Sequence, residues 1–171
     1  DGQITKRPIR ALTLSALAPK FGEHLWDLGT GSGSIAIEWL LSHPSVTATA
    51  VEANSERAAR AAHNAMTLGV ERLDVITAKS IDVLDDLPAP DVVFVGGGLT
   101  QELLDVLWNI MPVGCRFVTN AVTLESEVIV AQAHAAKGGE LMRIEIANSK
   151  PLGTKRGWSS AYPIVQWSVT R

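Results

Sequence analysis

Short apolar runs alternate with longer segments of helical periodicity along most of the chain. The apolar runs predict buried strands at 24–28, 46–51, 73–77, 91–95 and 116–120. The periodic segments predict helices at 6–17, 34–41, 55–68 and 101–111, and a fifth that follows Thr123 as its N-cap and ends near 137. Strands that alternate with helices in this way indicate an α/β fold.

The chain breaks this alternation after Gly138 and Gly139. Segments 141–147 and 162–169 predict two more strands with no helix between them, which is a hairpin-like ending. The segment between them, 148–161, has no periodicity and is predicted to be a long loop. Loops of this length are often functional.

The composition narrows the class of protein. At 171 residues the chain is predicted to form one domain, and it contains no apolar run near the roughly 18–20 residues of a membrane span. Its net charge of −3 argues against a nonspecific nucleic-acid binder, and its one cysteine, Cys115, favours a reducing compartment. We therefore expect a cytoplasmic domain that binds neither membrane nor nucleic acid. Because it begins without methionine, we expect a domain taken from a longer protein.

A glycine-rich loop, Asp-Leu-Gly-Thr-Gly-Ser-Gly at 27–33, follows the first predicted strand and opens a helix. Glycines permit positive φ and let a ligand approach the backbone, and the helix N-terminus behind them favours an anion. Glu52, which ends the second strand, lies 19 residues beyond Gly33, and such a carboxylate can hold both hydroxyls of a ribose. The pattern predicts a cofactor with a ribose, although a tight turn without a ligand would also use glycines.

The glycine spacing separates two cofactors. A dinucleotide fingerprint is G-x-G-x-x-G, whereas this chain has G-x-G-x-G followed by Ser34 and Ile35, so a NAD dehydrogenase is disfavoured. The string from Asp27 to Gly33 resembles the first motif of class I S-adenosylmethionine-dependent methyltransferases. The resemblance implies a Rossmann-like, doubly wound, mostly parallel seven-stranded sheet with an antiparallel last strand. It also implies that this cofactor is bound by Asp27, Gly29, Thr30, Gly31, Ser32, Gly33 and Glu52.

The end of the fourth strand bears on the substrate. Methyltransferases that act on base amines often carry Asn/Asp-Pro-Pro-Tyr/Phe there, but this chain has Gly96-Gly97-Gly98. Three glycines leave an open wall that suits a large flat substrate, with Gly97 and Gly98 as its contacts, or they form a flexible turn. We keep two alternatives open: a methyltransferase of RNA or protein, and a non-catalytic domain that binds the cofactor.

Several segments together resemble one family of the cobalamin pathway, the decarboxylating precorrin methyltransferases that act on carbon 15. They are Ile4-Thr5-Lys6, the loop at 27–33, and the segments 94–97, 120–125, 151–153 and 163–167. The tail resembles the fused form, in which such a domain follows an N-terminal methyltransferase domain. The resemblance implies one domain over 1–171, a precorrin substrate, S-adenosylhomocysteine as product, and a homo-oligomer, by family habit a tetramer.

The resemblance also assigns individual residues. It places Thr5 and Ser80 at the cofactor, although Lys79 stands where the family often has Asp, and Thr5 is also predicted to be a helix N-cap. Asn120 ends the fifth strand and is our candidate catalytic residue, or else it caps the loop that follows. A precorrin carries many carboxylates, so cations of the predicted tail loop are expected to bind substrate or to lie solvated at the surface: Lys150, Lys155 and Arg156. No His or Cys cluster has metal-ligand spacing, and we expect no metal.

Overall fold

The structure is a computed structural model that describes residues 5–171. Its helices are α1 (Arg7–Leu17), α2 (Ser34–Ser42), α3 (Ser55–Thr67), α4 (Gln101–Ile110) and α5 (Leu124–Lys137), with short 3-10 helices η1 (Ser80–Asp82) and η2 (Leu84–Asp86). Its strands are β1 (His24–Leu28), β2 (Thr47–Glu52), β3 (Asp74–Thr77), β4 (Val92–Val95), β5 (Arg116–Ala121), β6 (Glu140–Ile144), β7 (Ala147–Leu152), β8 (Lys155–Ser160) and β9 (Ile164–Thr170). Within this described part, no helix combines the length and apolar character that a membrane span requires.

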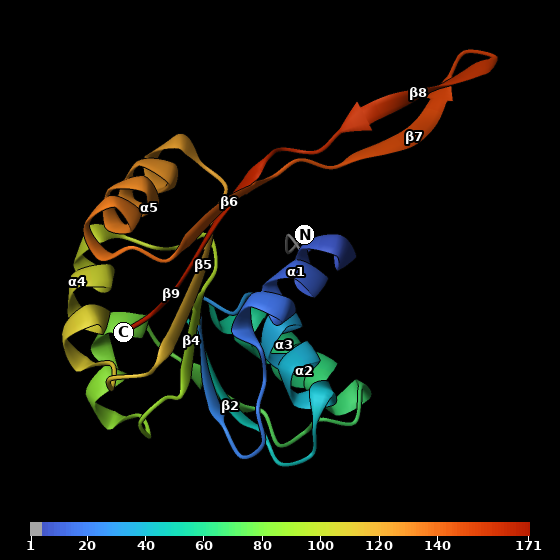
Figure 1. The fold of residues 1–171 in the computed structure, drawn as a ribbon. Coiled ribbons are helices and arrows are strands. Elements are labelled where there is room, and N and C mark those ends of the chain that lie inside the picture. The colour runs from blue at the N-terminus through green and yellow to red at the C-terminus, as the bar shows by residue number, and fades with distance from the viewer. Residues whose placement is uncertain (1–4) are drawn as a thin grey trace.

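Within residues 5–171, seven strands form one sheet in the order β3-β2-β1-β4-β5-β9-β6. The first five strands pair in parallel, and β9 pairs antiparallel with both β5 and β6. Helices α1, α2 and α3 cover one face of this sheet, and α4 and α5 cover the other (Figure 1). The predicted doubly wound sheet with an antiparallel last strand is therefore confirmed.

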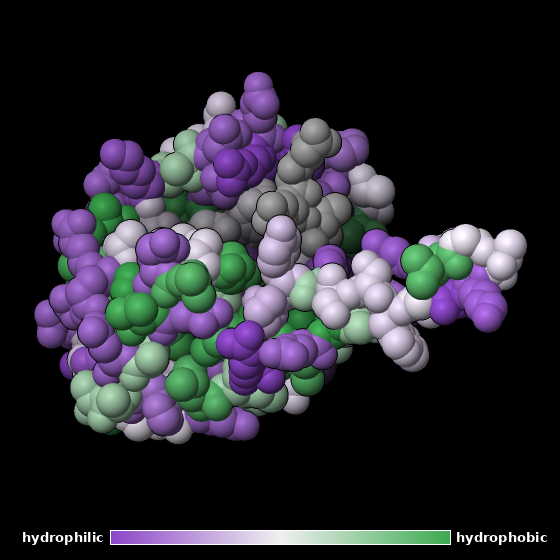
Figure 2. All heavy atoms as spheres, turned by 90° about the horizontal axis from the view of Figure 1, so that it is seen from above, coloured by the Kyte–Doolittle hydropathy of each residue, from purple (hydrophilic) through white to green (hydrophobic). Residues whose placement is uncertain are grey.

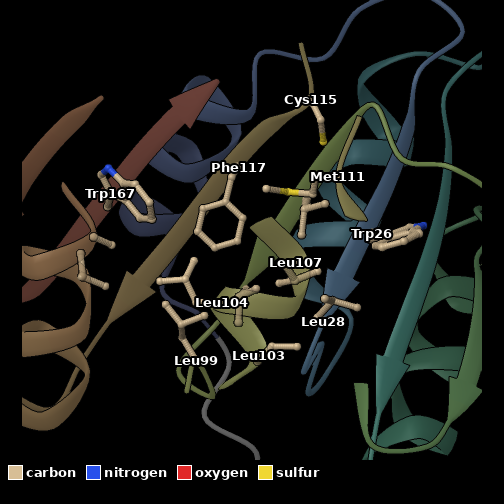
Figure 3. Packing of buried hydrophobic residues seen from close by; sticks show 14 of the residues in the cluster. Trp26, Leu28, Leu99, Leu103, Leu104, Leu107, Met111, Cys115, Phe117 and Trp167 are labelled. Carbon is tan, nitrogen blue, oxygen red and sulfur yellow. The ribbon is translucent and has the colours of Figure 1, made fainter. Parts of the chain in front are cut away.

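Two hydrophobic clusters hold the helices to the sheet, one on each face. On the α4–α5 face, Leu104 and Leu107 of α4 pack toward Phe117 of β5 and Trp167 of β9, and all four side chains are fully buried (Figure 3). On the α1–α3 face, the cluster includes the fully buried Trp39 of α2. Because the sheet is buried on both faces, its central strands read as continuous apolar runs.

The prediction of a long loop at 148–161 is wrong. This region contains the antiparallel pair β7 and β8, joined through Gly153 and Thr154, and the pair forms a sheet separate from the main one. We call residues 147–160 the arm; it extends away from the body (Figures 1 and 2). In the described structure, the residues of β7 and β8 are exposed or half-buried, so they need no alternation of apolar and polar side chains, and the sequence shows none.

The prediction that Thr5 caps the first helix is also wrong. The first helical hydrogen bond runs from the Arg10 N–H to the carbonyl of Lys6, so Lys6 is the N-cap, and no side chain of the described residues caps this end. Thr5 therefore lies one residue too early for its hydroxyl to cap the helix. Its carbonyl instead accepts a hydrogen bond from Arg10 Nη1 at 2.8 Å.

We predict that Thr119→Val stabilises the fold. The Thr119 side chain on β5 is fully buried, and its Oγ1 has no hydrogen-bond partner in the described structure. Replacing an unpaired buried hydroxyl with a methyl group should raise the free energy of unfolding by roughly 1 kcal/mol. Urea denaturation measures this change. Thr49→Val is the matched control, because Thr49 is also buried but its hydroxyl lies 3.2 Å from His24 Nε2; it should lower stability, and a loss in Thr119→Val would contradict the prediction.

Candidate functional site

The predicted site residues gather at the carboxyl ends of the parallel strands, where ligands bind in open α/β sheets. Two neighbouring regions can be distinguished there. The first, which we call the cradle, is the loop Asp27–Gly33 together with Glu52. The second is a cavity of about 670 Å³ beside the N-terminus of α1 and the ends of β4 and β5.

The three glycines of the cradle have positive φ but different surroundings. At Gly29 (φ 71°) and Gly31 (φ 61°), an added Cβ would meet no atom of residues 5–171 within 4 Å, so these residues leave the space over the loop open. At Gly33 (φ 80°), it would lie 3.2 Å from the Ala61 Cβ of α3. Gly29 and Gly31 therefore leave room for a ligand, whereas Gly33 lets α3 pack closely against the start of α2.

Glu52 fixes the shape of the loop. Its Oε2 accepts a hydrogen bond from the Gly31 N–H at 2.9 Å, and its Oε1 accepts one from the Asn54 N–H at 3.0 Å. A carboxylate has about four acceptor directions, so each oxygen keeps one for a ligand hydroxyl. The side chain is almost fully buried, which places those directions inside the cradle.

We predict that Glu52→Gln weakens binding of an adenosyl ligand. An amide group can accept only one of the two backbone N–H bonds, so its NH₂ group would face the N–H of Gly31 or Asn54. The loss should be about 5- to 30-fold in Kd for S-adenosylhomocysteine, measured by isothermal titration. Glu56→Gln, on the exposed surface of α3, is the control and should keep the parent Kd. Unchanged affinity in Glu52→Gln would show that the carboxylate is not part of the binding site.

Asp27 is the least satisfied polar group of the cradle. Its Oδ2 accepts hydrogen bonds from Thr30 Oγ1 at 2.7 Å and from the Ala36 N–H at 3.0 Å, while its buried Oδ1 has no partner in the described structure. Burial, offset in part by the bonds from Thr30 and Ala36, raises the pKa of this carboxyl to about 6. A buried carboxylate oxygen without a donor is suited to a cationic ligand group such as an ammonium.

Other predicted cofactor residues support the loop or border it. The carbonyl of Ser32 accepts a hydrogen bond from Asn64 Nδ2 of α3 at 3.0 Å, a contact that the sequence analysis missed. Ser80 is half-buried at the start of η1, just after Ala78, whose N–H donates to the Glu52 carbonyl at 3.1 Å. Ser80 therefore lies at the β2–β3 edge of the cradle.

The cavity is mostly apolar. Its aliphatic and aromatic lining comes from α1, β4, β5 and the segments that flank the arm: Ile9, Phe94, Val122, Ile144, Ile146 and Ile164. Three predicted residues line it, namely Thr5, Gly97 and Asn120. Among the described lining residues, the cationic side chain is that of Lys6. The volume of the cavity lies within the range of about 300–1,000 Å³ that small-molecule sites occupy.

Cradle and cavity adjoin at the ends of β1 and β4. A Cβ on Gly96, which lines the cavity, would lie 3.7 Å from the carbonyl oxygen of Gly29 in the cradle. The backbones approach closely there because neither residue carries a side chain. A ligand in the cradle would therefore lie next to one in the cavity.

The structure does not bring every predicted substrate residue to the cavity. Lys150, Lys155 and Arg156 lie exposed on the arm, and none of them lines the cavity. Gly98 is exposed beyond Gly97 and also lies outside the cavity lining. Within one chain, these side chains thus face solvent rather than the cavity.

The strand order, the glycine loop and the acidic residue at the end of β2 define the class I methyltransferase fold. An S-adenosylmethionine-dependent O-methyltransferase from Thermotoga maritima has the same fold, with a TM-score of 0.79 over 100% of this chain and 68% of that one. Its sequence identity is 18%, so this likeness concerns the fold alone.

The chain belongs to the precorrin methyltransferase domain family, whose model matches residues 1–171. The precorrin-6Y C(5,15)-methyltransferase [decarboxylating] of Sinorhizobium sp is 48% identical over 172 residues, which cover 100% of this chain and 42% of that protein. The crystal structure of the C-terminal domain of precorrin-6Y C5,15-methyltransferase from Rhodobacter capsulatus has a TM-score of 0.95 and 49% identity, covering 100% of this chain and 92% of that one. The chain thus spans less than half the length of the Sinorhizobium relative, and the family resemblance predicted from its motifs is confirmed.

Proposed function

We propose that this chain transfers a methyl group from S-adenosylmethionine to carbon 15 of a precorrin and removes an acetate carboxylate as carbon dioxide, in cobalamin biosynthesis. The observation that carries the proposal is the contact between the cradle and a large apolar cavity at the Gly29–Gly96 approach. Family membership and the printed activities of the relatives support it. Those relatives imply a second, N-terminal methyltransferase domain as the partner of this one.

The cradle fits S-adenosylmethionine in its donor and acceptor groups. The unpartnered Oδ1 of Asp27 would accept from the ammonium group, and Glu52 keeps acceptor directions for the two ribose hydroxyls. Gly29 and Gly31 leave the space that the chain of the ligand requires, and Ser80 borders the adenine side. When bound, this cofactor supplies an electrophilic methyl group on a sulfonium and leaves as S-adenosylhomocysteine.

The main task of the protein residues in methyl transfer is positioning. The nucleophilic carbon must lie about 3 Å from the methyl group, in line with the departing sulfur. Gly96 and Gly97 have no side chains, so a flat macrocycle can approach the end of β4 closely. The new carbon–carbon bond forms as the carbon–sulfur bond breaks, and the methylated carbon then loses its proton.

The cavity lining also favours the loss of carbon dioxide. Phe94, Ile144 and Ile164 would exclude water from the bound macrocycle. The acetate carboxylate would then lose the hydration that stabilises its ionised form. The electron pair of the broken carbon–carbon bond passes into the conjugated macrocycle, and the side-chain carbon takes up a proton. Lys6 at the exposed edge would pair with a carboxylate that remains, and Asn120 would contact the substrate from the cavity wall.

Mass spectrometry of a turnover reaction tests this function. The chain is incubated with S-adenosylmethionine and a precorrin-6B-class tetrapyrrole, and the product should gain CH₂, lose CO₂ and appear with one equivalent of S-adenosylhomocysteine. Omission of S-adenosylmethionine is the control. Turnover of RNA or protein instead of the tetrapyrrole would overturn the proposed substrate. Failure to bind S-adenosylhomocysteine would overturn the cofactor assignment.

We also propose that the arm joins copies of this chain into a homo-oligomer, as the family resemblance implies. An isolated two-stranded hairpin is only marginally stable in water, and here Leu152 and Trp158 are 70% and 79% exposed. The arm has three cations and no acids, so it contributes +3 to the net charge of −3 and leaves −6 on the remaining residues. An acidic body and a basic arm are complementary, which favours a second copy as the partner.

We predict that Trp158→Ser lowers the mass of the assembly without unfolding the chain. The side chain is exposed in a single copy, so its loss should change the stability of the monomer by no more than about 0.5 kcal/mol. Sedimentation equilibrium measures the mass. Val113→Ser is the control, since Val113 is 89% exposed outside the arm and should leave the mass unchanged. A monomeric parent, or an unchanged mass in Trp158→Ser, would contradict the proposal.

A further inference from the structure

A buried polar cluster joins three elements at the wall of the cavity. Asn120 of β5 donates from Nδ2 to Thr13 Oγ1 of α1 at 2.8 Å, and its Oδ1 accepts from Gln166 Nε2 of β9 at 2.9 Å. Gln166 Nε2 also donates to Thr13 Oγ1 at 3.3 Å. All three side chains are at least 95% buried, and Asn120 also lines the cavity.

All three contacts can be satisfied in only one orientation of the Asn120 amide. If this amide alone were turned, its NH₂ group would face the NH₂ group of Gln166, and donor would meet donor. If both amides were turned, two carbonyl oxygens would face the single hydroxyl proton of Thr13. The arrangement in the structure satisfies all three contacts, because Thr13 Oγ1 accepts twice and Gln166 Nε2 donates twice.

This orientation leaves defined hydrogen-bonding capacity on Asn120. An amide has two N–H donors and two acceptor directions, and the cluster uses one of each. Within the described structure, the second Nδ2 hydrogen has no protein partner. In a mostly apolar cavity, such a donor suits an oxygen acceptor of the ligand, and a carboxylated macrocycle provides many.

We infer that Thr13 and Gln166 are positioning residues, which hold the Asn120 amide so that its free N–H is directed to a substrate carboxylate oxygen. The identity of the substrate in this inference rests on the proposed function. The orientation of the Asn120 amide is independent of the proposed function. Thr13 and Gln166 act through Asn120, since their own polar contacts are with each other and with that amide.

A kinetic double-mutant cycle tests the inference. Thr13→Val and Gln166→Met each remove one contact to Asn120 at similar volume, together with the longer contact between Thr13 and Gln166. Each should lower kcat/KM for the tetrapyrrole about 10- to 100-fold. Both should leave the Kd for S-adenosylhomocysteine within about twofold, because the cradle is separate. In an Asn120→Ala background, neither substitution should lower kcat/KM further. Thr13→Ser keeps the hydroxyl and should retain activity near that of the parent.

Two control variants repeat these substitutions at sites outside the Asn120 cluster. Thr119→Val and Gln132→Met repeat the chemical changes at a buried threonine with no partner and at an exposed glutamine on α5; both should keep parental kinetics. Losses that add fully to that of Asn120→Ala would show a general structural role and overturn the inference. If Gln166→Met fails to bind S-adenosylhomocysteine, the Thr13→Val cycle decides alone.

A second readout separates this inference from the proposed function. In NMR hydrogen exchange of the parent, one Asn120 side-chain amide proton should exchange slowly and the other quickly, and in Thr13→Val both should be fast. This result supports the orientation even if the parent turns over no tetrapyrrole, an outcome that would overturn only the proposed function and the substrate named here. Two Asn120 protons with equal exchange in the parent would overturn the positioning role.

Discussion

Replacing Gly33 with alanine is expected to lower the free energy of unfolding by about 2–5 kcal/mol. Two costs add at this position. Gly33 has a φ of 80°, where a residue with a Cβ is strained, and the new Cβ would lie 3.2 Å from Ala61 Cβ and 3.3 Å from Ile37 Cδ1. Neither neighbour can move away easily, because Ala61 belongs to α3 and both side chains are buried. Urea denaturation measures the loss.

Alanine substitutions at two other glycines separate the cost of backbone strain from the cost of close packing. Gly22→Ala places a Cβ at a φ of 78° with no atom within 4 Å, so it should cost only the strain, roughly 1 kcal/mol. Gly31→Ala is equally open and should cost a similar amount of stability, but its Cβ would occupy the cradle and weaken binding of S-adenosylhomocysteine. A Gly33→Ala variant no less stable than Gly22→Ala would show that close packing of α3 does not require this glycine.

Asp27→Asn is expected to make the chain more stable than the parent above pH 7, and equally stable near pH 3. In the folded chain, burial raises the pKa of Asp27 to about 6, whereas an unfolded aspartate titrates near 3.9. Between these values the folded state binds more protons than the unfolded state, so the stability of the parent falls as pH rises from about 4 to 6. The total loss is about 3 kcal/mol and persists at higher pH.

The same carboxyl should link ligand binding to pH. Pairing with an ammonium favours the ionised form, so binding of S-adenosylhomocysteine should release a proton and weaken as pH falls below 6. Titration of the parent and of Asp27→Asn across pH 5–8 measures this dependence, and the variant should bind weakly with little dependence on pH. Glu38→Gln, a half-exposed change on α2, is the control for general charge effects. A parent affinity that is flat across pH 6 would exclude a direct contact between Asp27 and the ammonium.

Local sequence predicted the cradle but not the cluster behind the cavity. Asp27 and the three glycines lie within seven residues, and the spacing to Glu52 follows from one β-α-β unit, so the sequence alone relates them. Asn120, in contrast, contacts Thr13 from 107 residues away, and Gln166 contacts Thr13 from 153 residues away. Nothing in the short segments around these residues indicates such a contact.

The two corrections have different physical causes. The arm was missed because both of its faces are exposed, so the period-two pattern that marks a half-buried strand has no reason to form. The N-cap was misplaced by one residue, because a Thr before a helical pattern resembles a cap wherever the first helical hydrogen bond begins. The roles of Lys150, Lys155 and Arg156 in substrate binding stay predictions, and they would require contacts beyond one copy of the chain.

The position of β9 also constrains the order in which this chain assembles. Among the described strands, β6 pairs with β9 alone, which follows it by about twenty residues and inserts between β5 and β6. During synthesis at about 5–20 residues per second, β6 must therefore wait roughly 1–4 s for a pairing partner. Over that interval, the β5 edge is unpaired and Trp167 has not yet covered Phe117. The newly made chain thus passes through a stage with an open, apolar sheet edge, at which chaperone binding or aggregation would compete with folding.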